Sequence, residues 1–468
     1  YYTIDADVML EGSEGTIYVK DYEGNPAEDA EVYIVEDGKD DVLIGSTKKD
    51  GTLTTNVLCK ESGKKFTIYA TSEMGYSYRY TGTTAAAAGD KDGKPSQISH
   101  NAATDGNTGE NITWFANPAA AEHKAVVEYM TEEVYASADK KAESEEGKCT
   151  LRQFTQSKEA VLINSVSIKG LESGTTYYYR VGDGKHWSEY DKFSTAGGKD
   201  KTTKFFIVGD TQLSGDSEAD KSELELLRQI GNGVSAEKVD FGLQTGDFID
   251  NAGYGGYWNE ILDAFRESFG ATDIVHVMGN HESFGDPTGK TSREVFNIGD
   301  SEYYSVEYGD VYIAVIHNNA DLKEAAAWLK KDAAASSCQW KLLSVHQPPY
   351  YTNAKVGSEG FNEAIPPMAE AAGIQAVFSG HDHSYARTES LREGKKAEKD
   401  GITYFICGDL GEKSRAADYK ITTEDKFSFA KVTQDYDAIY MLAEADEDAL
   451  MLTAKDADGT VVDTFTLK

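Results

Sequence analysis

Short runs of alternating apolar and polar residues fill the first 82 positions of the chain, and turn-forming residues separate them. Thr16–Lys20, Glu31–Val35 and Lys65–Ala70 are such runs, with Gly-Asn and Asp-Gly pairs between them. A period of two is typical of strands that bury one face. The pattern predicts a small antiparallel β-sandwich over residues 1–82.

A stretch without periodicity follows at residues 83–95. It is rich in alanine and ends in Pro95, so we expect a linker. A second set of short strands then begins, with Trp114 early and three consecutive tyrosines late, at 177–179. Strands at this spacing predict a second β-sandwich over residues 95–196.

The pattern changes near Lys204, where apolar runs begin to alternate with amphipathic segments. We predict strands at 205–208, 239–244, 274–278, 311–316, 341–345, 376–378 and 403–406, helices at 217–231, 255–269, 321–335 and 361–372, and a closing hairpin at 450–467. Alternation of this kind predicts a layered βαβ sandwich over residues 203–468. The predicted fold class is therefore multidomain, with two N-terminal β-sandwich domains followed by an α/β domain.

Composition narrows the classes of partner. The chain of 468 residues has 46 basic and 80 acidic residues, a formal net charge of −34, and this excludes a partner held by its nucleic-acid backbone. No apolar run approaches the roughly 18 residues of a transmembrane segment. The four cysteines are expected to be buried and unpaired, with a Cys338–Cys407 bridge as the alternative.

Five short motifs each come directly after a predicted strand. Their polar side chains are expected along one edge of a sheet, because ligands gather at the carboxyl ends of parallel strands. The side chains are Asp210, Asp247, Asn280, His346, His381 and His383. A glycine precedes four of them and is expected to let the chain turn sharply off its strand without a Cβ clash.

Carboxylate oxygen and imidazole nitrogen suit divalent first-row metals or ferric iron, and the lack of thiolates argues against a structural zinc site. Two metals about 3.5–4 Å apart, bridged by one carboxylate, can activate a hydroxide and clamp a displacement at phosphorus. Each motif alone is weak, since a Gly-Asp pair after a strand is usually a turn. The ordered set of five favours a site for two metal ions, of Fe, Zn or Mn.

The order GD, GDxxD, GNHE, VHxPPY and GHDH resembles the calcineurin-like metallophosphoesterase superfamily, and most closely the purple acid phosphatases and their bacterial relatives. Residues 95–196 resemble the fibronectin type III-like domain that precedes the catalytic domain in that family. Residues 1–82 fall outside the resemblance and look like an accessory sandwich of an exported protein.

The resemblance implies a role for each motif residue. Asp210, Asp247 and His383 would hold the first metal. Asp247 would bridge to a second metal, which Asn280, His346 and His381 would hold. His281 would face the substrate and protonate the leaving alkoxide or stabilise the charged transition state.

Three positions depart from the family pattern. Asp250 stands where purple acid phosphatases have the tyrosine that gives their colour, so the protein is not expected to be purple. Gln212 stands where the wider superfamily often has histidine, and it is expected either to bind the metal or to lie behind the ligands. Val356 replaces a second substrate-facing histidine.

Two other histidines follow or lie within predicted strands. His317 follows a strand and lies either near the site or in the core, while His276 is expected to be structural.

These features predict an acid phosphatase-like enzyme that hydrolyses phosphomonoesters by attack of metal-bound hydroxide, with His281 assisting the leaving group. The alternatives are a phosphodiesterase or nucleotidase on the same site, or a non-catalytic cell-surface binding protein. The expected partner is a small phosphate ester. We expect an extracellular or cell-surface location in a bacterium, with attachment through the N-terminal region. The two N-terminal sandwiches are the indirect basis for this expectation, because the chain starts at Tyr1 with no leader present.

Overall fold

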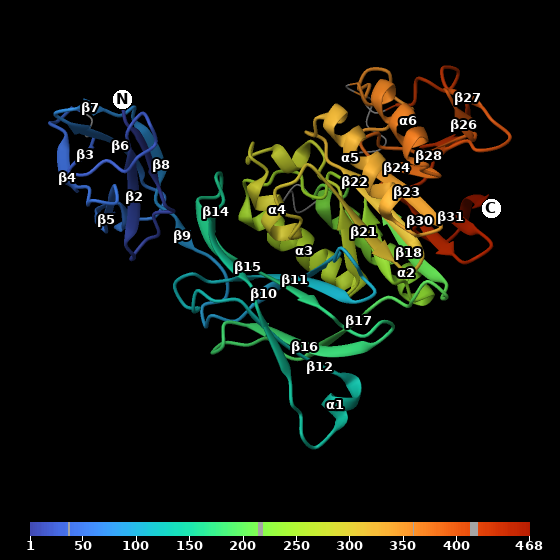
Figure 1. Cartoon of the computed structure of the whole chain (residues 1–468), viewed down its shortest axis with the longest axis horizontal. Helices are drawn as coiled ribbons and strands as arrows, with labels where there is room; N and C mark the ends of the chain where they lie inside the picture. The colour runs from blue at the N-terminus through green and yellow to red at the C-terminus, as the bar shows by residue number, and fades with distance from the viewer. Residues whose placement is uncertain (36–37, 214–218, 359, 412–419) are drawn as a thin grey trace. The chain divides into compact units, whose positions relative to one another are not determined.

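The computed structural model describes residues 1–35, 38–213, 219–358, 360–411 and 420–468. Two compact units make up the chain (Figure 1). The first consists of residues 1–94, 115–123 and 149–163, and the second of residues 95–114, 124–148 and 164–468.

The N-terminal part of the first unit consists of two small sheets. Their orders are β1-β2-β5 and β4-β3-β6-β7, with β8 beside β6. The elements are β1 Thr3–Ala6, β2 Gly15–Lys20, β3 Glu31–Ile34, β4 Val42–Ser46, β5 Thr52–Thr55, the 3-10 helix Val57–Cys59, β6 Lys65–Ser72, β7 Gly75–Tyr76 and β8 Tyr80–Thr83. Ile17 and Val19 of one sheet share a buried core with Val32 and Ile68 of the other. The alternating residues therefore bury one face of each sheet, as predicted.

The expectation of a linker at 83–95 is wrong for its first half. Ala86 and Ala87 form strand β9 (Ala86–Ala87), which pairs in parallel with Glu159 and Ala160 of β15 (Glu159–Lys169). The neighbouring Ala85 is fully buried. Small methyl side chains allow a strand to pack closely without any alternating pattern, so periodicity could not reveal this one.

The region predicted as the second sandwich, residues 95–196, is built of strands. The second unit contains a sheet of order β13-β12-β16-β17. Its elements are β12 Val126–Thr131, β13 Glu143–Glu146, β16 Thr176–Gly182 and β17 Asp191–Ser194, with the short helix α1 Glu132–Ala136. β10 is Ser96–Asn101, β11 Gly109–Ala116 and β14 Lys148–Gln153.

Two larger sheets form the rest of the second unit. In the first, β20, β19 and β18 are parallel, and β30, β31 and β32 continue it in antiparallel fashion. These strands are β18 Thr203–Val208, β19 Phe241–Gln244, β20 Asp273–His276, β30 Ile439–Ala445, β31 Leu450–Asp456 and β32 Val461–Leu467. On the other side of β20 the same sheet continues into β10 and β11. The predicted closing hairpin is β31 and β32.

The second sheet has the order β21-β22-β23-β24-β28-β25-β29, and its four strands from β22 to β28 are parallel. Its strands are β21 Tyr303–Tyr308, β22 Val311–Ile316, β23 Trp340–Val345, β24 Ala376–Ser379, β25 Tyr385–Thr388, β28 Thr403–Cys407 and β29 Phe429–Thr433. A separate hairpin pairs β26 Leu391–Arg392 with β27 Lys395–Lys396.

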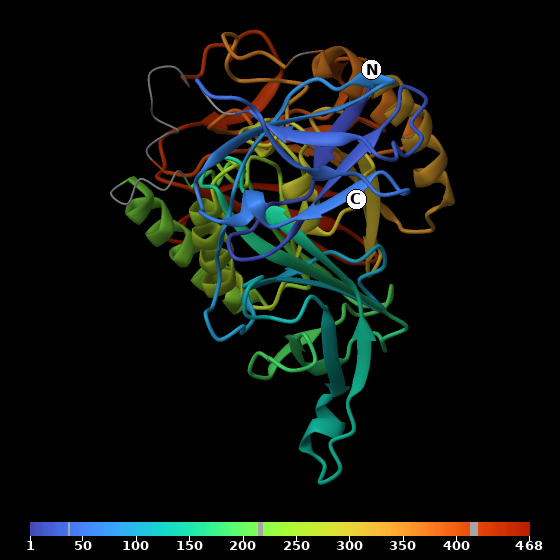
Figure 2. The same ribbon diagram turned by 90° about the vertical axis from the view of Figure 1, so that its left-hand side faces the viewer.

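Helices cover the outer faces of the two sheets. The helices of this part of the chain are α2 Ala219–Glu237, α3 Gly255–Phe269, α4 Lys290–Phe296, α5 Leu322–Ala335 and α6 Phe361–Ala372, and the short 3-10 helix η2 His281–Ser283 follows β20. α2 and α3 lie on one side and α5 and α6 on the other (Figures 1 and 2). Phe205 and Leu243 of the first sheet share one buried core with Leu342 and Phe378 of the second. The sheets therefore pack face to face between two layers of helices.

The predicted fold class, β-rich N-terminal regions followed by α/β layers, is confirmed. The predicted helix at 217–231 starts in residues outside those described, and its described part extends to Glu237. Cys338 and Cys407 are buried and unpaired, so the alternative of a bridge between them is wrong. No helix in the described ranges combines the length and hydrophobicity that a membrane crossing needs.

One buried polar cluster lies within the first sheet, where β11, β10 and β20 are neighbours. The ligand atoms of His100, Glu110 and Asp273 are within 4.8 Å of one another, and all three residues are buried. Glu110 lies 2.9 Å from His100 Nδ1, and Asp273 accepts a hydrogen bond of 2.6 Å from Tyr308. Burial raises the pKa of the Asp273 carboxyl to about 7 and that of Glu110 well above its usual value.

These raised pKa values predict that the protein loses stability as the pH rises. The native carboxyls keep their protons to a higher pH than the unfolded chain does, so stability falls from about pH 4 to about pH 7. Glu110→Gln mimics the protonated acid, since its amide can donate to Asp273. We expect it to raise the melting temperature by about 2–4 °C at pH 8, and not at pH 5.

Thermal unfolding of both proteins at the two pH values measures this effect. Glu447→Gln, at an exposed glutamate, is the control and should not change the melting temperature at either pH. Equal melting temperatures of wild type and Glu110→Gln at pH 8 would show that the buried pair is not a source of alkaline instability.

Candidate metal centre

The motif residues follow five parallel strands of the two sheets. Asp210 follows β18, Asp247 follows β19 and Asn280 follows β20, all in the first sheet. His346 follows β23, and the His381–His383 segment follows β24, in the second sheet. Because the two sheets pack face to face, their carboxyl ends bring these side chains together. The edge predicted from the sequence is thus made by two sheets instead of one.

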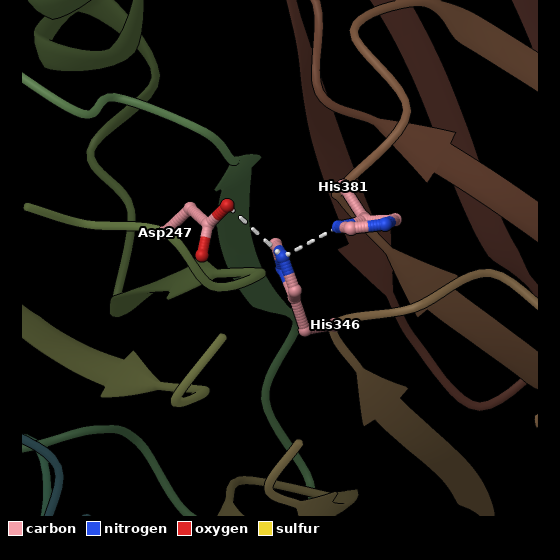
Figure 3. A group of neighbouring side chains, drawn as sticks. All are labelled: Asp247, His346 and His381. Atoms are coloured by element: carbon pink, nitrogen blue, oxygen red, sulfur yellow. Dashed lines mark hydrogen bonds and ion pairs between the residues drawn. The ribbon is translucent and has the colours of Figure 1, made fainter. Parts of the chain in front are cut away.

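The centre of the group is a buried carboxylate with two imidazoles (Figure 3). His346 Nε2 lies 3.1 Å from Asp247 Oδ2 and 3.2 Å from His381 Nδ1. Asn280 Oδ1 is 3.2 Å from His346 Nε2 and 3.1 Å from His381 Nδ1. These four side chains offer two oxygens and two nitrogens that converge on one point.

A second group adjoins the same carboxylate. Asp210 is fully buried, and its Oδ1 lies 3.6 Å from His383 Nε2. Its carboxylate also accepts the backbone N–H of His381. Gln212 Nε2 is 3.1 Å from Asp247 Oδ2. Gln212 thus links the loop of Asp210 to Asp247.

The local electrostatics fit a cation. Burial opposes charge on His346, but Asp247 outweighs burial and raises the pKa of His346 to about 10. His346 in turn holds the pKa of Asp247 below its usual value against the effect of burial. A proton on the imidazole thus balances the buried carboxylate, and a metal ion at this point would supply the same positive charge. Oxygen and imidazole donors suit first-row metals.

Hydrogen bonding orients the central imidazole. His346 Nδ1 is 3.0 Å from the carbonyl oxygen of Thr245. A carbonyl only accepts, so Nδ1 carries the proton and Nε2 faces Asp247. An N–H bond of this kind on the far side of the ring is the usual arrangement of metal-binding histidines.

Glycines make the close approach of the side chains possible. A Cβ on Gly279 would stand 2.2 Å from Asp247 Oδ1, and one on Gly380 would stand 2.3 Å from Asp210 Oδ2. A Cβ on Gly246 would stand 2.3 Å from His346 Nδ1. Each of these glycines leaves room for a side chain that another motif supplies.

The expectation that glycines make the sharp turn is only partly correct. Gly246 has a positive φ of 106°. Three motif residues themselves have positive φ, 52° at Asp210 and Asp247 and 66° at His381, whereas Asn280 has φ of −79°. Non-glycine residues in this region are strained, and such strain is typical of functional sites.

His281 lies at the rim of the group, with 19% of its side chain exposed. Its Nδ1 is 2.9 Å from the backbone oxygen of Asp250 and 3.3 Å from the carboxylate of the same residue. Its Nε2 is 3.9 Å from Asp247 Oδ2. Although burial opposes the charge, Asp250 and Asp247 raise the pKa of His281 to about 9. Asp250, expected only as a replacement for tyrosine, is thus the partner of His281.

Glu282 was not singled out from the sequence, although it stands in the GNHE motif. Its buried carboxylate accepts backbone N–H groups of Asp247, Phe248, Ile249 and Gly279, at 3.2, 2.8, 3.3 and 2.6 Å. It therefore joins the loop that carries Asp247 to the loop that carries Asn280. Only the presence of an acidic residue inside a motif of ligands could have indicated this role.

Two protein families match the chain. The family described as purple acid phosphatase, N-terminal domain, matches residues 95–195. The family described as calcineurin-like phosphoesterase matches residues 203–385. Asp210, Asp247, Asn280, His346 and His381 all lie within the second match.

Curated relatives also resemble a large part of the chain. Purple acid phosphatase 15 of Arabidopsis thaliana is 26% identical over 295 residues, which is 55% of this chain and 55% of that protein. Purple acid phosphatase 18 of the same plant is 25% identical over 327 residues, 65% of this chain and 69% of that protein. The chain thus spans little more than half the length of the first of these relatives.

Solved structures share the fold. The purple acid phosphatase PPD1 from yellow lupin (Lupinus luteus) seeds aligns with a TM-score of 0.66 and 14% identity, covering 100% of this chain and 96% of that one. The structure of PhoD aligns with a TM-score of 0.57 and 12% identity, covering 81% of this chain and 90% of that one. These matches confirm the resemblance inferred from the motifs. The chain therefore carries a purple acid phosphatase N-terminal domain at residues 95–195, followed by a calcineurin-like phosphoesterase domain at residues 203–385.

Proposed function

We propose that this chain is a dinuclear metal-dependent phosphatase that hydrolyses phosphomonoesters. The observation that carries the proposal is the convergence of carboxylate, amide and imidazole donors around Asp247, with the partly exposed His281 beside them. The matching families and the curated relatives support the same reading.

The proposed ligands divide into two sets that share Asp247. Asp210, His383 and Gln212 complete the first set, and Asn280, His346 and His381 complete the second. Fe, Zn and Mn all suit these donors. Asp250 occupies the position of the tyrosine that gives purple acid phosphatases their colour, and its side chain contacts His281. The metal-loaded protein should therefore lack the purple colour.

The cations, when bound, would supply Lewis-acid activation of water and of the phosphate oxygens. His281 would donate a proton to the leaving group. Its Nδ1–H is held by the carbonyl of Asp250, which leaves Nε2 to deliver a proton. Asp250 and Asp247 favour the protonated ring, so the acid form is the one prepared for the substrate.

The alternatives use the same residues. A phosphodiesterase or nucleotidase would need room for a second ester arm, and turnover of a panel of monoesters and diesters distinguishes it. A non-catalytic binding protein is disfavoured because each expected ligand position keeps a side chain able to bind a metal.

We further propose domain limits of 1–82, 95–196 and 203–468, with a fibronectin type III-like middle domain. The β-rich N-terminal regions and the small number of cysteines support a secreted bacterial protein, outside the cell or at its surface. Residues 1–82 would be the accessory domain through which it attaches.

Metal content tests the proposed function directly. Protein purified without chelator should hold about two metal ions per chain by inductively coupled plasma mass spectrometry. Removal of the metals should abolish phosphatase activity, and reloading should restore it. Fewer than one ion per chain with no uptake on reloading would favour the binding protein instead.

A single methyl group should disturb the centre. Gly279→Ala places a Cβ against Asp247 Oδ1, so we expect weaker metal binding and a fall of about tenfold or more in kcat/KM. Gly256→Ala is the matched control, because a Cβ there meets no atom within 4 Å. Equal metal content and activity in the two variants would contradict the tight packing described above.

His281→Ala should lower kcat by about 10²–10⁴-fold for an alkyl phosphate. The loss should be smaller for p-nitrophenyl phosphate, whose leaving group needs little protonation. His123→Ala, at an exposed histidine, is the control and should leave kcat unchanged. An equal loss with both substrates would assign His281 to charge stabilisation instead of proton transfer.

A further inference from the structure

The segment that presents Asn280 leaves the first sheet after β20. Val277 still donates its N–H to the backbone of Gln244, at 3.1 Å. From Met278 onward, side chains take over: the N–H of Gly279 is bound by Glu282 and that of His281 by Asp247. The position of Asn280 therefore depends on side chains that accept backbone N–H groups.

The N–H of Met278 is bound by a residue of the second sheet. It donates to Nδ1 of His317 at 3.0 Å. The next residue, Asn318, donates its own N–H to the carbonyl of Met278 at 2.9 Å. Residues 317 and 318 thus satisfy both backbone groups of Met278, two residues before Asn280.

His317 is held firmly in this place. It is fully buried, and its backbone N–H donates to the carbonyl of Glu302 at 2.9 Å. An N–H group can only donate, so Nδ1 of His317 must be unprotonated. Burial, together with the charge of Arg293, lowers the pKa of His317 to about 3. The ring is therefore neutral at ordinary pH.

The place of His317 in the fold matches that of the proposed ligands. The strands β18, β19, β20, β23 and β24 are each followed by residues of the metal centre. β22 is the parallel neighbour of β23, and His317 is the first residue after it. At this strand end the side chain contacts the neighbouring loop of Met278.

We propose that His317 is a positioning residue, whose neutral Nδ1 fixes the loop of Met278 and thereby places Asn280 as a metal ligand. This inference rests on the proposed metal centre. The proposed positioning role depends on the Nδ1 atom alone, whereas a role in packing the core would depend on the whole ring.

Substitutions can separate the acceptor atom from the ring. In His317→Asn the amide oxygen stands as many bonds from Cα as Nδ1 does, so it can accept from Met278. In His317→Gln the polar atoms stand one bond further out, and His317→Phe keeps the ring without an acceptor. Zn²⁺ is titrated into each metal-free protein by calorimetry, and the melting temperature of each metal-free protein is measured.

We expect His317→Asn to bind Zn²⁺ within about threefold of wild type, and the Gln and Phe variants to bind the weaker ion about 10–100-fold less tightly. His276→Phe is the matched control. His276 is also buried and stacks on Phe296 at 3.9 Å, and its ring nitrogens have no hydrogen-bond partner among the described residues. Its loss should leave Zn²⁺ affinity unchanged.

The outcomes distinguish this inference from the proposed function. A wild-type chain that binds fewer than two ions would overturn the dinuclear centre itself. Two ions in wild type with equal affinities in all three His317 variants would overturn the positioning role alone. Wild-type affinity in the Phe variant, with weaker binding and a lower melting temperature of the metal-free protein in the Asn and Gln variants, would show that the ring acts only by packing.

Discussion

The buried negative charge of Asp247 is the constraint on which the rest of the site depends. Only 2% of the residue is exposed, and a carboxylate so far from water must have positive charge beside it. The neighbouring imidazole of His346, and in the proposed function the metal ions, meet this need. Asn280 and His381 converge on the same small volume, since both contact the His346 imidazole that lies beside Asp247.

Two sheets meeting at their strand ends make that approach possible. A single sheet would spread the ends of five strands over a long edge, because neighbouring strands lie about 4.8 Å apart. Packing the sheets face to face halves the spread. The cost is crowding, and it explains why Gly246, Gly279 and Gly380 lack side chains where the loops cross.

The sequence predicted the α/β layers well, because they depend on local signals. Apolar runs fix the strands, and proposed ligands such as Asp247 and His346 stand directly after them. Ala86 and Ala87 escaped prediction because alanine fits strand, helix and linker alike. The tight fit around the glycines involves residues far apart in the chain, and no local pattern records it.

The supporting residues were harder to recognise than the ligands. Glu282 lies within a motif, yet its four backbone partners become neighbours only in the folded chain. His317 was left open between the site and the core, since a single histidine after a strand has no distinguishing spacing. Its role became apparent only in the structure, where the backbone N–H of Met278 donates to its Nδ1.

The antiparallel strands at the C-terminal side of the first sheet have a consequence for how the protein is made. β18, which leads to Asp210, pairs with β19 on one edge and with β30 on the other. During synthesis that second edge stays uncovered until residues 439–445 have emerged from the ribosome. Contacts so distant in sequence slow folding and expose strand edges to other chains. Expression of a fragment that ends at residue 385 would leave this edge permanently open, and such a fragment should aggregate.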